Sequence, residues 1–169
     1  MADEISGSMD IGGRLTWTQW MRKVELEGLL DFLSPATGRS RDDSIVDLSH
    51  GTISLNDPCA AYGHFDELES YLRDQCIPYD RHADARYEYD GEEASFRAGM
   101  EGELIATATQ DGIITVSASL VARYINDGTT LAEMLAVESD DETAGLRLTI
   151  LRQAHPLPDF EFVEEGLDD

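Results

Sequence analysis

The chain has 169 residues, of which 35 are Asp or Glu and 12 are Lys or Arg, so its formal net charge at pH 7 is −23. Hydrophobic residues make up 41% of the chain, which is enough for a packed core and argues against wholesale disorder. The sequence has no stretch of about eighteen apolar residues, which argues against a membrane span. So large a negative charge also argues against direct binding to nucleic acid or anionic lipid.

The N-terminal part predicts a flexible leader followed by a helix. Residues 1–13 are rich in Gly, Ser and acidic residues, which is typical of an unstructured leader. Thr16 and Gln19 have the spacing of a capping box, which predicts the start of a helix. Apolar residues at helical spacing continue this pattern until Pro35 ends it, and a polar loop follows.

The next segment predicts a short strand and an amphipathic helix. Residues 52–55 have strand character, and Asn-Asp-Pro at 56–58 predicts the end of that strand. Residues 64–75 predict a helix whose apolar residues share one face. That apolar stripe consists of Phe65, Leu68, Tyr71 and Leu72. On the same helix, Glu69 and Arg73 are placed to form an i,i+4 ion pair.

Two Asp-Gly pairs predict two β-hairpins, because this dipeptide favours the tight turns that join antiparallel strands. The first hairpin is expected to join residues 85–89 to 94–97 around Asp90-Gly91, and the second to join 103–110 to 113–118 around Asp111-Gly112. The strands of the second hairpin are apolar enough to lie in the centre of a sheet.

The C-terminal part predicts two short helices, a strand and a tail. A helix over 119–125 is expected to end at Asn126-Asp127-Gly128, and Thr130 and Glu133 form a second capping box. Residues 138–142 predict an acidic loop. Alternation of Leu146, Leu148 and Ile150 with polar residues predicts a half-buried strand, which Pro156 and Pro158 would end. Six acids in residues 159–169 predict a solvated tail.

Together these elements predict a single-domain α+β protein with a mainly antiparallel sheet, in which two Asp-Gly hairpins pack against three to four helices. The expected organisation is a leader over 1–13, one domain over 14–158 and an acidic tail over 159–169. The two cysteines, Cys59 and Cys76, do not imply a disulfide framework, and reduced thiols in a cytoplasmic protein are the simpler interpretation.

The residues that could carry chemistry form no recognisable catalytic or metal motif. Cys59 and His64 lie five residues apart, but the residues around them match no nucleophile motif. No two of the four histidines have ligand spacing, and no C-x-x-C occurs. An EF-hand aligned on Gly91 would place Arg86 and Arg97 where carboxylates are required. The glycine pairs lack the motif that holds phosphate, so we expect no catalytic site, no cofactor and no bound metal.

The acidic clusters therefore remain as the candidate working surface. Residues 57–103 hold thirteen acids and four bases, and residues 126–169 hold twelve acids and two bases, whereas 104–125 are balanced. Such a surface attracts basic proteins, and carboxylates on ordered elements can approximate the charge density of a nucleic-acid duplex. The candidate partner-binding residues are Asp66, Glu67, Glu69, Asp74, Asp80, Asp84, Glu88, Asp90, Glu92, Glu93, Glu138, Asp140, Asp141 and Glu142. In composition the chain resembles nucleic-acid mimics of phages and mobile elements, of the anti-restriction or anti-CRISPR type, which implies inhibition of a basic, nucleic-acid-binding protein.

Two alternatives stay open at this stage. The chain could be a non-mimic adaptor or antitoxin-like binding protein that uses the aromatic residues Tyr79, Tyr87, Tyr89 and Phe96 as anchors. It could also be a salt-adapted α+β protein with an unrecognised enzymatic site, since the chain contains one lysine against eleven arginines. For each acidic cluster taken alone, an ordinary solvated surface is the simpler explanation.

Overall fold

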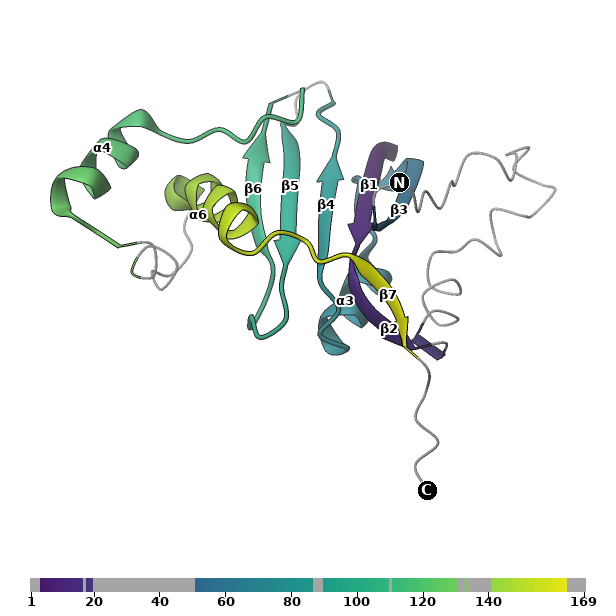
Figure 1. Ribbon diagram of the computed structural model, residues 1–169. Helices are drawn as coiled ribbons and strands as arrows, with labels where there is room; N and C mark the ends of the chain where they lie inside the picture. The colour runs from purple at the N-terminus through teal and green to yellow at the C-terminus, as the bar shows by residue number, and fades with distance from the viewer. Residues whose placement is uncertain are drawn as a thin grey trace.

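The computed structural model describes residues 4–16, 18–19, 51–86, 90–109, 111–130, 133 and 141–163. Its strands and helices are, in chain order, β1 (Glu4–Ile11), β2 (Gly13–Thr16), β3 (Ile53–Ala61), α3 (Asp66–Asp74), β4 (Tyr79–Ala83), β5 (Gly91–Phe96), β6 (Leu104–Ala108), α4 (Ala118–Asp127), α6 (Asp141–Ala154) and β7 (Phe160–Val163). The fold is α+β, as expected, and its main sheet is antiparallel with the strand order β3-β1-β4-β5-β6 (Figure 1). A second sheet pairs β2 with β7.

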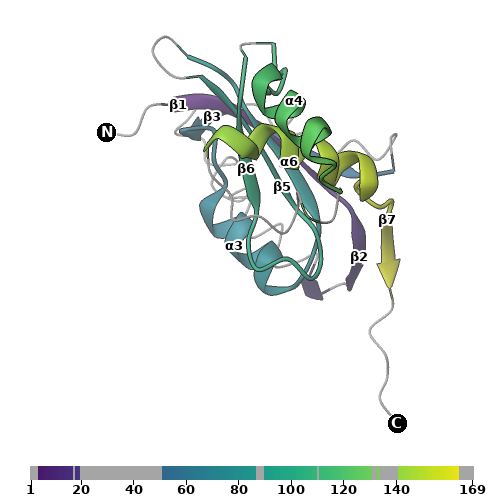
Figure 2. The ribbon, with the colours of Figure 1, turned by 90° about the vertical axis from the view of Figure 1, so that its left-hand side faces the viewer.

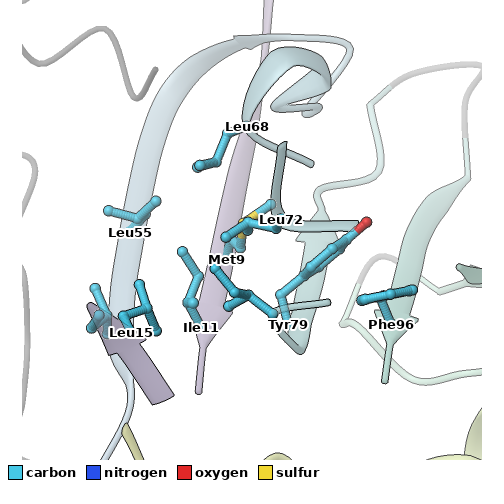
Figure 3. Close-up of a cluster of buried hydrophobic side chains, with 10 residues drawn as sticks. Met9, Ile11, Leu15, Leu55, Leu68, Leu72, Tyr79 and Phe96 are labelled. Atoms are coloured by element: carbon cyan, nitrogen blue, oxygen red, sulfur yellow. The ribbon is translucent and has the colours of Figure 1, made fainter. Parts of the chain in front are cut away.

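One face of the main sheet is apolar and lies against α3. The buried residues Met9, Ile11, Leu55, Tyr79 and Phe96 extend from four neighbouring strands. Leu68 and Leu72 of α3 complete this cluster, together with Leu15 of β2, Ile53 and Ile77 (Figure 3). The rings of Tyr79 and Phe96 stack with their centroids 5.8 Å apart. This cluster is the main hydrophobic core, and it fixes α3 against the sheet.

The opposite face of the sheet is only partly covered, by α6. Ala144, Leu148 and Leu151 of this helix pack on Leu104 and Ala106 of β6. Figure 2 shows α3 and α6 on opposite sides of the sheet, so the part of the fold around β4 and β5 has three layers. The face of β3, β1 and β4 beyond α6 carries polar residues instead.

Both expected terminal segments contain strands. Residues 4–11 form β1, an interior strand of the sheet, so the prediction of a flexible leader was wrong. The residues of this strand alternate, because Ile5, Gly7, Met9 and Ile11 are buried, whereas Ser6, Ser8 and Asp10 between them are more exposed. The expected acidic tail contributes Phe160–Val163 as β7, which pairs in parallel with β2.

The strand expected at 52–55 is confirmed, but it does not end at Pro58. β3 runs to Ala61, and its pairing with β1 is irregular between Ile5 and Gly7, opposite Pro58. Because β3 is an edge strand, a proline there costs no hydrogen bond to a second neighbour.

The first hairpin was predicted with the wrong strand, because residues 85–89 are not the segment that pairs with β5. β5 pairs with Tyr79–Ala83, and Asp90-Gly91 lies at the beginning of β5 instead of in a two-residue turn. At the second Asp-Gly pair, the N–H of Gly112 donates to the carbonyl of Thr109 at 2.9 Å, so a turn forms. The segment after this turn forms an isolated bridge between Ala108 and Ile114 instead of a strand. β6 pairs with β5, and the loop over residues 97–103 connects these two strands.

The strand predicted over Leu146–Ile150 is also wrong, because these residues lie in α6. Ala144, Leu148 and Leu151 have helical spacing, and their burial on β6 outweighs the short alternation that suggested a strand. The predicted acidic loop likewise ends early, since Asp141 and Glu142 belong to the first turn of this helix.

The locally encoded elements agree with expectation. α3 lies within the range 64–75 predicted for this helix, and α4 ends before Gly128, which has the left-handed conformation of a C-cap. In the capping box of Thr130, its N–H donates to Glu133 Oε2 at 2.8 Å and its hydroxyl accepts from the Glu133 N–H at 3.3 Å. The equivalent bonds between Thr16 and Gln19 are also present. The rest of the long helix predicted before Pro35 lies outside the described residues.

Candidate functional site: the polar side of the sheet and its acidic end

The structure divides the candidate acids into an internal set and a surface set. Glu69, Asp80, Glu92 and Glu93 form ion pairs with arginines of the fold. Asp66, Glu67, Asp74, Asp84 and Asp90 are exposed. Asp141 and Glu142 lie at the start of α6, and Glu88, Glu138 and Asp140 lie outside the described residues. Therefore only part of the predicted acidic surface is available to a partner.

The first ion network lies on the α3 side of the sheet around Arg81, whose side chain is 1% exposed. Its Nε lies 3.0 Å from Glu69 Oε1, and its Nη2 contacts Glu92 Oε1. His64 Nε2 lies 3.1 Å from the same Glu92 oxygen, and Arg73 Nη1 lies 3.8 Å from Glu69 Oε2. Glu69 is thus buried, whereas Asp66 and Glu67 of the same helix are exposed. The expected pair of Glu69 with Arg73 is confirmed.

The ionisation of Glu69 reflects two opposing effects. Burial raises the pKa of this carboxyl above 4.5, because a charged group loses hydration inside the fold. The positive charge of Arg81 and the hydrogen bond from the Phe65 N–H at 2.9 Å both lower the pKa. Burial outweighs these two contacts, so the net effect is a raised pKa, which the charge of Arg81 limits.

The second network lies on the opposite side, between the sheet and α6. The guanidinium of Arg97 contacts both carboxylate oxygens of Asp80, at 2.8 and 3.1 Å. Arg152 Nη1 of α6 lies 2.8 Å from Glu93 Oε2, and His82 Nδ1 lies 2.7 Å from Glu93 Oε1. These contacts join α6 to β4 and β5 by charge as well as by apolar packing.

The uncovered part of this face is polar along two rows of cross-strand neighbours. One row contains Asn56, Ser8, His82 and Glu93, and the other contains Ser54, Asp10, Asp80 and Ser95. A cavity of about 290 Å³ lies between these rows and Arg152. Asp10 lies opposite Asp80 and accepts a hydrogen bond from the Ser54 hydroxyl. Asp80 is partly buried and pairs with Arg97, whereas Asp10 is exposed.

Exposed acids also flank the end of the sheet at which β4 and β6 end and β5 begins (top of Figure 1). We call Asp66, Asp84, Asp90 and Asp111 the acidic end. Asp84 follows β4 and lies 2.9 Å from His82, and Asp66 begins α3, where His64 connects it to Glu92. Asp90 precedes β5, and Asp111 lies in the turn after β6. Because antiparallel pairing brings these strand ends together, four carboxylates are exposed at the same end.

The sequence analysis did not predict the ion pairs that arginines form with the candidate acids. These pairs determine which acids are internal and which remain exposed at the surface. Arg81, Arg97 and Arg152 pair with carboxylates on other elements. Such contacts depend on strand register, so spacing along the sequence gave no signal for them. The i,i+4 pair within α3 was the exception.

Among the residues that the structure describes, the remaining candidates do not converge into a reactive site. Cys59 lies in β3 and donates its N–H to Asp57 Oδ1, and both cysteine thiols are free. Within the described part of the chain, no group of three or more metal-ligating side chains comes together. Tyr79 and Phe96 are core residues, whereas Tyr87 and Tyr89 lie outside the described residues.

Comparison with protein-family models, with curated proteins and with solved structures finds no match to this chain. Among the described helices, none is sufficiently long and apolar to cross a membrane.

Proposed function

We propose that this chain is an acidic protein-interaction module that binds a basic, nucleic-acid-binding protein and occupies the site of the nucleic acid. In this mode, carboxylates on rigid elements take the place of backbone phosphates. The partner is of the kind found in defence or regulation, such as a restriction or CRISPR effector. No chemical reaction is required of the chain.

The observation that carries this proposal is that arginines are paired within the fold, whereas many carboxylates remain exposed. Five arginines, Arg14, Arg73, Arg81, Arg97 and Arg152, each form an ion pair with a carboxylate of the fold. Their positive charge is therefore largely cancelled locally, while the acidic end keeps its carboxylates exposed. The side chains of Asp66 and Asp84 are 83% and 51% exposed. A concentrated negative potential of this kind accelerates association with a basic cleft.

The rigidity of the supporting elements favours this function over steering by a loose tail. Asp66 begins a helix that is anchored in the core through Leu68 and Leu72, and Asp84 and Asp90 border paired strands. Fixed carboxylates lose little conformational entropy on binding, so more of the electrostatic attraction remains as affinity. The adaptor alternative loses support, because Tyr79 and Phe96 belong to the core.

The test is competition with nucleic acid. Labelled duplex DNA or RNA is bound to each member of a panel of purified restriction and CRISPR effectors, and the chain is added at 50 and 300 mM salt. We expect the chain to displace the duplex from one or more effectors, with a steep loss of the chain's affinity at the higher salt. Absence of displacement from the whole panel at 50 mM salt would argue against the proposal.

A matched pair of variants locates the surface. The first removes three charges from the acidic end, by Asp66→Asn, Asp84→Asn and Asp90→Asn. The control removes three exposed charges elsewhere, by Asp74→Asn, Glu101→Gln and Asp127→Asn. Both have the same net charge, so a general charge effect would weaken both equally. We expect the first variant to lose at least about tenfold more affinity than the control.

A further inference from the structure

β6 is an edge strand of the main sheet, and no described strand lies beside part of its outer edge (Figure 1). A cavity of about 440 Å³ lies along this edge and is lined by residues of β5, β6 and α6. We propose that an extended, basic segment of the partner protein adds to the sheet here as a further strand. This inference rests on the proposed function for the kind of partner, but its test needs no effector.

The backbone of Ile105 points away from the sheet. The Thr107 carbonyl accepts from the N–H of Thr115 at 3.4 Å, on the side opposite β5. Because successive residues of a strand direct their N–H and C=O groups to alternate sides, those of Ile105 point to the same outer side as those of Thr107. Within the described part of the chain, neither backbone group of Ile105 has a hydrogen-bond partner. Free edge groups of this kind are a template for an added strand.

The chain's own next segment stops short of Ile105. Ala108 and Ile114 form an isolated bridge, which gives Thr115 the place opposite Thr107. The Thr115 carbonyl oxygen lies against Gly145 of α6, where an added Cβ would be 2.3 Å from it. This carbonyl is therefore directed to α6, and the segment continues towards α4 instead of along β6. The next outward-facing residue, Ile105, is left without a neighbouring strand.

The two faces of β6 determine which side chains an added segment can carry. Leu104 and Ala106 are buried against α6, whereas Ile105 and Thr107 lie on the other face and are exposed. A residue that pairs with Ile105 places its side chain beside that of Ile105, which is 41% exposed. The residues before and after it face α6, and we expect them to be small because Ala106 and Ala144 already pack together there.

The charges at the cavity favour a basic segment. Glu92 and Asp90 line the cavity, and none of its described lining residues is basic. Glu92 lies opposite Thr107, on the same face as Ile105, and remains 31% exposed although it contacts Arg81. A Lys or Arg that pairs with Ile105 covers this side chain with its aliphatic stem and directs its charged end to the two carboxylates. A second copy of the chain is a poorer occupant, since each copy has a formal net charge of −23.

The test separates strand addition from simple attraction between charges. The probe is a capped seven-residue peptide in which three arginines alternate with four alanines. The first control carries a methyl group on the backbone nitrogen of each arginine, so it keeps the charge but loses the N–H groups that would pair with Ile105. The second control has glutamate in place of each arginine. Each peptide is titrated into the full chain while the amide NMR signal and hydrogen exchange of Ile105 are followed.

We expect the arginine peptide to give saturable shifts and at least about tenfold slower exchange of the Ile105 N–H. Both controls should bind at least about tenfold more weakly. Equal binding of the methylated peptide would indicate attraction without strand pairing and would overturn the proposal. Equal binding of the glutamate peptide, or no saturable shift with the arginine peptide, would also overturn it. Protection of the Ile105 N–H that rises with chain concentration, without peptide, would assign the edge to a second copy instead.

Two substitutions at one position test the edge from the side of the chain. Ile105→Pro removes an N–H that is not part of the ladder with β5, so the sheet should remain intact. Ile105→Val keeps this N–H, and we expect the proline variant to bind the arginine peptide about tenfold more weakly than the valine variant. Unchanged affinity in a folded Ile105→Pro would contradict the proposal. If this variant does not fold, the methylated peptide still decides the matter.

The outcome can be told apart from that of the competition assay. Peptide binding along β6 without displacement of duplex from any effector would retain the edge site and refute the proposed function. Displacement of duplex without peptide binding along β6 would refute the edge site alone.

Discussion

Replacing Arg81 by methionine is the most informative perturbation of this fold. Arg81 is almost completely buried and pairs with Glu69 and Glu92, whose side chains are 4% and 31% exposed. The substitution keeps a long apolar side chain but leaves Glu69 as a buried charge with only the more distant Arg73 at 3.8 Å. Breaking a buried ion pair in this way costs about 3–5 kcal/mol. A domain of this size has a total stability of only about 5–15 kcal/mol, so the variant should be severely destabilised.

The assay is urea unfolding, followed by circular dichroism, of the original chain, Arg81→Met and the double variant Arg81→Met with Glu69→Leu. Because the double variant replaces the ion pair with apolar residues, it should recover most of the lost free energy of unfolding. A loss below about 1 kcal/mol in the single variant, or no recovery in the double variant, would refute the reasoning.

The pH dependence of the single variant provides an independent check. Burial already holds the pKa of Glu69 above 4.5 in the folded state, and removing Arg81 raises it further. When the folded-state pKa of a carboxyl exceeds its unfolded value, its contribution to stability is fully present below the unfolded value. That contribution is lost as pH rises through the folded value. The deficit of Arg81→Met should therefore shrink as the pH falls from neutral towards 4.5.

Two further predictions concern close contacts in the fold. Gly145→Ala would place a Cβ 2.3 Å from the Thr115 carbonyl oxygen. Although alanine favours helices, thermal melts should show a loss of about 1–3 kcal/mol in the free energy of unfolding. A higher Tm would contradict the close approach. Asp10→Asn removes a like charge opposite Asp80 and should raise stability by about 0.2–1 kcal/mol at low salt, measured by urea unfolding. That gain should fade in molar salt, and its persistence there would argue against a charge effect.

The sequence predicted the elements that local signals define. α3 and α4 were predicted because apolar residues at helical spacing, together with Gly128 at the end of α4, act within one or two turns. The capping box at Thr130 depends on residues three apart, and its hydrogen bonds are present. The glycines of the N-terminal segment concealed β1, whose stability comes from pairing with β3 and β4 on both sides.

The candidate site was less predictable, because its charges are distributed by tertiary contacts. Leu148 and Leu151 fit the surface of β6 as a helix, and this packing brings Arg152 to Glu93. Once the register of β4 and β5 is set, Asp80 meets Arg97 and becomes an internal group instead of a surface acid. Composition alone could identify an excess of acids, but only the fold determines which of them are neutralised.

The pairing of β2 with β7 has a consequence for the order in which the chain acquires its structure. Gly13–Thr16 leaves the ribosome long before its neighbour Phe160–Val163, which is the last described strand in the sequence. β2 must therefore wait, with its pairing partner absent, until β7 has been synthesised. Closure over such a separation is entropically costly, and slow maturation is expected of topologies of this kind. During that interval the nascent polypeptide is exposed to proteases and to unintended association, and its repulsive charge helps to keep separate copies apart.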